Sequence, residues 1–146
     1  MVYIILGKGF EEVEALAPCD ILRRGGVEVR LAGIDSNEVE SGHGVTVKAD
    51  CLVDDVIIEK GDIVVFPGGL GGVATIRKSE KALSLMTEAY NAGNYVAAIC
   101  AGPTILGDLG ILKGKKAVCY PGMEDGMIGA EKCPGVNVVV DGTVIT

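Results

Sequence analysis

A cysteine lies where an apolar run meets a predicted helix start, and this is the position in the chain best suited to chemistry. Residues 96–99, Val-Ala-Ala-Ile, predict the end of a buried strand, and Cys100 follows directly. Residues 101–104, Ala-Gly-Pro-Thr, predict a helix start, since proline suits the first helical turn. Such a nucleophile elbow holds the side chain above the sheet, beside unpaired N–H groups. We therefore expect Cys100 to be a nucleophile whose thiol ionises easily, with a packed structural cysteine as the alternative.

A glycine turn offers a second group of candidates. Residues 62–66 predict a buried strand that runs into Pro67, Gly68 and Gly69. Loops at the carboxyl ends of parallel strands build the sites of α/β proteins. The backbone N–H groups of Gly68 and Gly69 could therefore bind a substrate oxygen. A plain turn is the alternative, and the glycines alone do not decide between the two.

Several titratable residues have only weak claims on a site. Glu11, Glu12 and Glu14 open a predicted helix, where acids suit the helix dipole and need be no more than surface charge. His43, the single histidine, lies in a predicted turn and is read as solvated rather than catalytic, since nothing ties it to Cys100. One histidine and five cysteines without a CxxC pair predict no metal site. Without a Walker or GxGxxG motif, no nucleotide cofactor is expected.

Composition limits the classes of function. The 146 residues suffice for one domain, 49% of them are hydrophobic and the net charge is −7. An acidic chain lacks the basic surface of a nucleic-acid binder, so no nucleic-acid partner is expected. No apolar run reaches transmembrane length and no signal peptide precedes the first strand, so we expect no membrane partner. Reduced thiols favour a cytoplasmic location.

Strand and helix patterns alternate through most of the chain, which predicts an α/β fold with a mainly parallel sheet. The first helix is expected to bury Val13, Leu16, Ala17 and Ile21, and to kink or restart at Pro18. A helix capped by Ser79 is expected to run to about Asn91. The remaining expectations are strands at 2–6, 27–33, 62–66, 96–99 and 115–120, and hairpins around 39–47 and 136–145.

Three stretches together resemble one family. They are GKGFEEVEAL (7–16), FPGGLGG (66–72) and AAICAGPTIL (97–106), each after an apolar strand. The chain resembles the ThiJ/PfpI superfamily, and within it the branch of Parkinsonism-associated deglycases. This resemblance implies a flavodoxin-like three-layer sandwich, similar to the glutamine-amidotransferase domain, and a homodimer with the first helix and residues 39–50 near the interface. It also implies that the single domain at 1–146 lacks a C-terminal loop and helix, so that missing segment is a candidate partner.

The resemblance also implies roles for individual residues. Cys100 matches the nucleophile, and Glu14 matches a glutamate that hydrogen-bonds its sulfur. Gly69 and Ala101 match positions whose N–H groups form an oxyanion pocket. Two further matches, Arg24 and His43, fall where relatives carry groups at the pocket edge or the dimer interface. The family's frequent catalytic histidine, just before a proline, is replaced here by Tyr120 before Pro121.

The expected function is conversion of a small reactive aldehyde, such as methylglyoxal, or deglycation of its adducts on amines or thiols. Cys100 would attack the aldehyde and Glu14 would move protons. A redox-sensing stress protein or chaperone-like protein oxidised at Cys100 is the second hypothesis. A cysteine peptidase or amidase comes last because a Cys–His dyad is missing.

Cys100 is expected to oxidise before the other four cysteines. An ionised Glu14 would raise the pKa of the thiol, whereas a protonated Glu14 would donate a hydrogen bond and stabilise the thiolate. We expect the second arrangement, with the same hydrogen bond stabilising a sulfinate on Cys100.

Overall fold

The computed structural model describes all residues, 1–146. The strands are β1 (Val2–Leu6), β2 (Val29–Gly33), β3 (Glu38–Glu40), β4 (Thr46–Lys48), β5 (Cys51–Leu52), β6 (Ile63–Phe66), β7 (Val96–Ala98), β8 (Lys116–Ala117), β9 (Glu131–Lys132), β10 (Val140–Asp141) and β11 (Val144–Ile145). The helices are α1 (Glu12–Arg24), α2 (Leu70–Lys78), α3 (Glu80–Asn91) and α4 (Pro103–Asp108), with 3-10 turns η1 (Val53–Asp55) and η2 (Glu124–Gly126).

The main sheet has seven strands in the order β10-β11-β7-β6-β1-β2-β5. Every neighbouring pair is parallel except β10 and β11, which form an antiparallel edge. The central strands carry almost only apolar residues, as expected for strands that are covered on both faces. The carboxyl ends of β6 and β7 therefore lie side by side, which places the loops after Phe66 and Ala98 next to each other.

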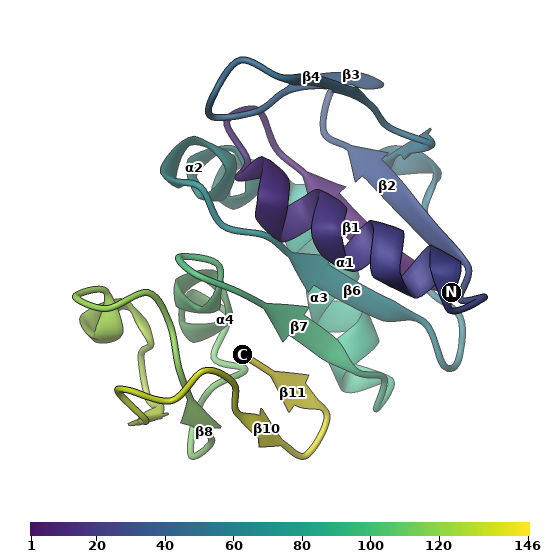
Figure 1. Cartoon of the computed structure of the whole chain (residues 1–146). Helices are drawn as coiled ribbons and strands as arrows, with labels where there is room; N and C mark the ends of the chain where they lie inside the picture. The colour runs from purple at the N-terminus through teal and green to yellow at the C-terminus, as the bar shows by residue number, and fades with distance from the viewer.

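The side chains of β1 alternate between two hydrophobic cores. Val2, Ile4 and Leu6 pack with Ala15 and Cys19 of α1 on one face of the sheet. Tyr3 and Ile5 belong to the larger core on the other face, which contains residues from α2, α3 and α4. Helices thus cover both faces, as Figure 1 shows for α1 in front of the sheet and α3 behind it. The predicted flavodoxin-like α/β architecture with a mainly parallel sheet is confirmed.

Several predicted elements are found and some differ. The hairpin at β3 and β4 is confirmed, and the hydroxyl of Ser79 accepts a hydrogen bond from the Ala82 amide at 3.2 Å to cap α3. The strand expected at 115–120 is wrong in length, since only β8 forms, and it pairs with β9 in a separate small sheet. The hairpin expected at 136–145 is shorter than predicted.

The first helix corrects two expectations. It runs unbroken through Pro18, so no restart occurs there. Three residues expected to be buried are exposed: Val13 and Ile21, at 66% and 67%, and Ala17. The buried residues are Ala15 and Cys19, and the expected Leu16 packs half-buried against the same core. No helix is both long and apolar enough to cross a membrane.

Candidate active site

Cys100 lies on a tight turn between β7 and α4, and its backbone has φ 61°. A positive φ is strained for a residue with a Cβ, so the surroundings must hold it. The Tyr120 amide donates to the Cys100 carbonyl at 2.8 Å, and the Ile99 amide donates to the Phe66 carbonyl at 3.2 Å. A Cβ on Gly102 would meet the Phe66 carbonyl oxygen at 2.8 Å, so the turn needs glycine there. The structure thus has the predicted nucleophile elbow, with Pro103 at the first position of α4.

Glu14 reaches the elbow from the first turn of α1. Its Oε2 accepts a hydrogen bond from the Gly68 amide at 2.8 Å. A Cβ on Gly68 would lie 2.6 Å from that oxygen, 2.6 Å from the Cys100 Cβ and 3.0 Å from its Sγ. The Glu14 carboxylate and the Cys100 sulfur therefore both lie next to Gly68, which has no side chain to separate them. Gly68 was expected to bind a substrate oxygen, but its N–H group instead positions Glu14.

The sulfur of Cys100 has opposing influences on its ionisation. Burial raises the pKa of the Cys100 thiol, and the hydrogen bond and charge of an ionised Glu14 raise it further. The backbone amides of Ala101 and Gly69 hydrogen-bond the sulfur and lower the pKa. With Glu14 ionised, the sum of these influences raises the pKa of Cys100, against the expectation of an easily ionised thiol. The protonation of Glu14 therefore decides how readily the sulfur ionises.

A cavity of about 450 Å³ opens in front of this pair. Its lining includes Glu14 and Cys100, together with Tyr120 and Pro121, the two positions expected at the pocket edge. Further lining residues that the sequence did not single out are Val118, Cys119, Glu124, Met127 and Cys133. One of these residues could have been found from the sequence, since Cys119 directly precedes Tyr120, which was already expected at the pocket edge. No histidine lines the cavity.

A chain of hydrogen bonds stabilises the turn that carries Cys100. The buried Thr104 hydroxyl donates to the Ala101 carbonyl at 2.6 Å. The guanidinium of Arg77, in the last turn of α2, donates to the Thr104 hydroxyl at 2.7 Å and to the Asp108 carboxylate at 2.8 Å. This network connects α2 to α4 and holds Ala101, the residue that follows Cys100. An oxyanion site needs such preorganised donors.

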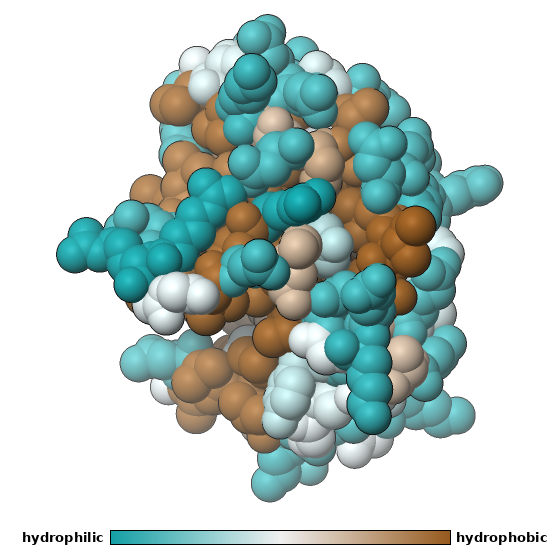
Figure 2. Space-filling model, turned by 90° about the vertical axis from the view of Figure 1, so that its right-hand side faces the viewer, coloured by the Kyte–Doolittle hydropathy of each residue, from teal (hydrophilic) through white to brown (hydrophobic).

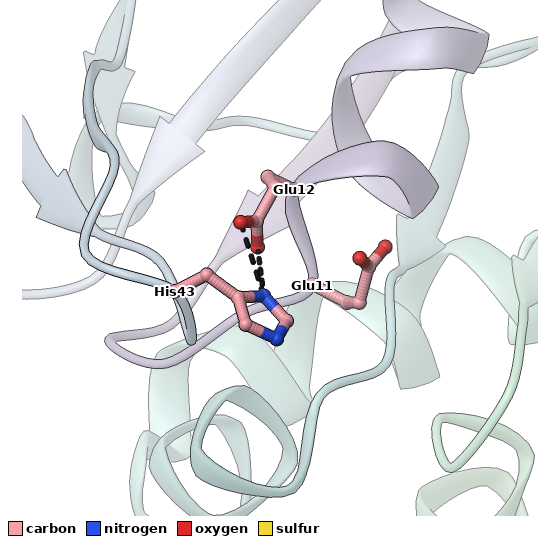
Figure 3. Close-up of side chains that lie close together, drawn as sticks. All are labelled: Glu11, Glu12 and His43. Carbon is pink, nitrogen blue, oxygen red and sulfur yellow. Dashed lines mark hydrogen bonds and ion pairs between the residues drawn. The ribbon is translucent and has the colours of Figure 1, made fainter.

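His43 lies outside the cavity of Cys100. Its Nδ1 is 3.1 Å from both carboxylate oxygens of Glu12 (Figure 3). A carboxylate oxygen of Glu11 lies within 4.8 Å of this pair. The Glu11 carboxylate caps α1 by accepting from the Glu14 amide at 2.8 Å. The hydrogen bond and charge of Glu12 raise the pKa of His43, and the same contact lowers the pKa of Glu12. These three side chains could together hold a metal ion, but His43 already pairs with Glu12 and the Glu11 carboxylate caps α1.

Arg24 also lies away from Cys100. It is in the last turn of α1, about 15 Å along the helix from Glu14, where it pairs with Asp20 at 3.9 Å. The expectation that it lines the pocket of its own chain is therefore wrong. Its side chain is exposed, and so are Val13 and Ile21 on the same helix. On the face shown in Figure 2, hydrophobic surface is broken into separate patches by hydrophilic side chains.

Comparison with known proteins places this site in a family. Residues 1–146 match the sequence profile of the DJ-1/PfpI family. The chain is 37% identical over 146 residues to a protein named as a deglycase from Pyrococcus horikoshii, covering 99% of this chain and 87% of that one. It is 36% identical over 145 residues to the protein dj-1beta of Drosophila melanogaster, covering 98% and 78% of the two chains. The crystal structure of Drosophila DJ-1beta superposes with a TM-score of 0.92 at 35% identity, over 99% and 78% of the chains.

Proposed function

The chain belongs to the DJ-1/PfpI family, and we propose that it is a cysteine-dependent enzyme for reactive 2-oxoaldehydes, such as methylglyoxal, or for their adducts. The observation that carries this proposal is the elbow cysteine facing Glu14 in an open cavity, with two amides directed at the sulfur. Relatives that are named as deglycases support the substrate class. The residues present complete a reaction without a cofactor.

In this mechanism the Cys100 thiolate attacks the aldehyde carbon, and Glu14 gives its proton to the resulting alkoxide. A hemithioacetal forms, and Glu14 is left ionised and able to act as a base. The amides of Gly69 and Ala101, which hydrogen-bond the sulfur in the free enzyme, are placed to stabilise the oxygen that becomes negatively charged. Glu14 takes the proton from the former aldehyde carbon and returns it to the neighbouring carbon, which gives a thioester of a 2-hydroxy acid. Water then hydrolyses the thioester and regenerates Cys100. The sum is addition of one water to the oxoaldehyde, with no net oxidation.

We propose that the pair of Cys100 and Glu14 holds one proton, and that Glu14 carries it while the sulfur is anionic. In this arrangement the carboxyl group donates to the thiolate instead of repelling it. Its other oxygen still accepts from the Gly68 amide. The hydrogen bond from Glu14 then lowers the pKa of Cys100 and the charge repulsion disappears, so burial is the one influence that still opposes ionisation.

The test is methylglyoxal consumption by the purified protein and by Cys100→Ser. We expect turnover in the wild type and none above background in Cys100→Ser. Cys51→Ser is the matched control, because Cys51 lies on the edge strand β5, which three strands separate from β7 and Cys100. Equal consumption by the wild type and Cys100→Ser would contradict the proposal.

Redox sensing at Cys100 is the second candidate function, with a stress-protective or chaperone-like role. The observation that favours it is that two more cysteines, Cys119 and Cys133, line the same cavity. A peptidase or amidase is less well supported, since His43 pairs with Glu12 outside the cavity.

We also propose that the protein forms a homodimer through α1. Val13, Ala17 and Ile21 follow one another at four-residue spacing and are all exposed, so they form one apolar stripe on the helix. Such a stripe on an otherwise acidic chain favours burial against a second copy. Arg24 at the end of the same helix would then lie near the partner.

A further inference from the structure

The cavity in front of Cys100 holds more sulfur than an aldehyde reaction needs. Cys119 and Cys133 both line it, and neither has a role in the mechanism above. All five cysteines are free. We propose that Cys119 is a resolving cysteine, which forms a reversible disulfide with Cys100 when a peroxide oxidises the nucleophile.

The backbone already brings these two residues together. The amide of Tyr120, the residue after Cys119, donates to the Cys100 carbonyl at 2.8 Å. Adding about 2.4 Å of covalent geometry on each side places the two Cα atoms at most about 8 Å apart. Disulfides usually span about 4.4–6.8 Å between Cα atoms. Residues 119 and 120 belong to no helix or strand, so a small local movement closes the remaining distance.

Three observations favour Cys119 over the other thiols. Cys100 and Cys119 are both half-buried against the same hydrophobic core, and Cys133 is not part of that packing. Cys51 packs on that core as well, but on β5, which three strands separate from β7. Cys133 is held at the end of β9, where its amide donates to the Ala117 carbonyl at 2.9 Å. Cys19 is buried in the core on the other face of the sheet.

Charge supports the same pairing. Burial raises the pKa of Cys119, and the charges of Glu124 and Cys100 raise it further. A thiolate on Cys100 therefore disfavours a second thiolate on Cys119, so Cys119 remains the thiol while the Cys100 thiolate reacts with peroxide. It becomes useful only after Cys100 has been oxidised.

The chemistry balances with hydrogen peroxide as the oxidant. The Cys100 thiolate attacks one peroxide oxygen and the O–O bond breaks. The departing hydroxide takes the proton that Glu14 carries, so Cys100 sulfenic acid and water form. The sulfur of Cys119 then attacks the Cys100 sulfur, the S–O bond breaks, and the departing hydroxide takes the thiol proton of Cys119 as water. Two thiols lose two electrons in total, and the peroxide gains them. The disulfide closes the cavity to substrate and protects Cys100 from irreversible oxidation.

The inference needs a reactive Cys100 but not aldehyde turnover, so its test does not use activity. The purified full chain is treated with equimolar hydrogen peroxide, free thiols are alkylated, and the protein is digested with trypsin without reductant. Lysines and arginines place each of the five cysteines in a different tryptic peptide, so every linkage is identified by mass. We expect a link between the Cys100 and Cys119 peptides in the wild type, in Cys133→Ser and in Cys51→Ser.

In Cys119→Ser we expect no such link, and the Cys100 peptide should instead gain two oxygens. The sulfinate expected from the sequence thus forms where no resolving thiol is present, and the cavity cysteine replaces that expectation in the wild type. Three results would overturn the proposal: a wild type that gains those oxygens without a link, a link from Cys100 to another cysteine, or no oxidation at Cys100. A mixture of unlabelled and nitrogen-15 protein separates the two kinds of disulfide. A link that joins light to heavy peptides would show pairing between chains and would also overturn it.

Discussion

The position of the proton between Cys100 and Glu14 has a consequence that can be measured directly. We expect Glu14→Leu to raise the pKa of Cys100, because leucine removes the hydrogen bond that a protonated Glu14 donates to the thiolate. A hydrogen bond to a charged group contributes about 1.5–3 kcal/mol. Since one pKa unit corresponds to about 1.36 kcal/mol, the expected rise is about one to two units.

Glu14→Gln is the matched control. Glutamine has nearly the same size and its amide can still donate to the sulfur, so the pKa of Cys100 should stay within about one unit of the wild type. It cannot carry a proton back and forth, so aldehyde turnover should fall by about 10²–10⁴-fold, as for a lost acid/base group. The two variants thus separate the effect of Glu14 on the thiol from its role in the reaction.

The assay is the rate of iodoacetamide alkylation of the Cys100 peptide between pH 4 and 10, measured by mass spectrometry. The sign of the change decides the outcome. If Glu14 were ionised beside the thiolate, its charge would raise the pKa of Cys100, and both Glu14→Leu and Glu14→Gln would lower it. A lower or unchanged pKa in Glu14→Leu would therefore refute the proposed proton position.

Three further predictions follow from the geometry. Gly68→Ala should abolish turnover while the protein still melts cooperatively, because the new Cβ displaces the Glu14 carboxylate. Gly42→Ala, whose Cβ would meet only ordinary contacts, is the control, and full activity in Gly68→Ala would contradict the proposed site. Ile21→Glu should convert a dimer into a monomer in light scattering at micromolar concentration, whereas Ile57→Glu, also exposed but outside α1, should not. A light-scattering mass of 15.1 kDa for the wild type would contradict the dimer. His43→Ala should leave turnover unchanged and lower the melting temperature most below about pH 6.5, because the raised pKa of His43 stabilises the fold while the imidazole is protonated. This contribution is lost as pH rises through that raised pKa, so a difference that persists at pH 9 would be inconsistent with this pairing.

The elements that were predicted correctly are those whose type is decided by a local pattern of residues. Residues 2–6 form a strand because an uninterrupted apolar run suits a doubly covered parallel strand. Ser79 caps α3 through its own backbone neighbours, and the elbow at Cys100 follows from small residues before Pro103. In each case the residues that decide the structure lie within a few positions of one another.

The second helix could not be read in this way. Residues 68–72 contain four glycines, which predict a turn, yet α2 begins at Leu70. The reason is tertiary: a Cβ on Gly72 would lie 2.7 Å from the Phe10 Cα, and one on Gly71 would lie 3.1 Å from the Gly9 Cα. The glycines let the start of α2 pack against the loop after β1. That contact joins residues about sixty positions apart, and no local pattern predicts it.

The three glutamates at the start of α1 show how far local reasoning extends into the site. By sequence they are equivalent, because each is an acid in the first turn, where the dipole favours it. Successive helical residues point about 100° apart, so the three side chains must diverge. Glu11 turns back and caps the helix, Glu12 meets His43, and Glu14 crosses to the Gly68 amide beside Cys100. The role of each carboxylate is decided by the segment that it contacts. For Glu14 that segment is the loop after β6, and the parallel pairing of β6 with β7 places this loop beside the turn at Cys100. A carboxylate becomes a candidate acid/base group here because of the sheet order, and not because of any feature of the helix that carries it.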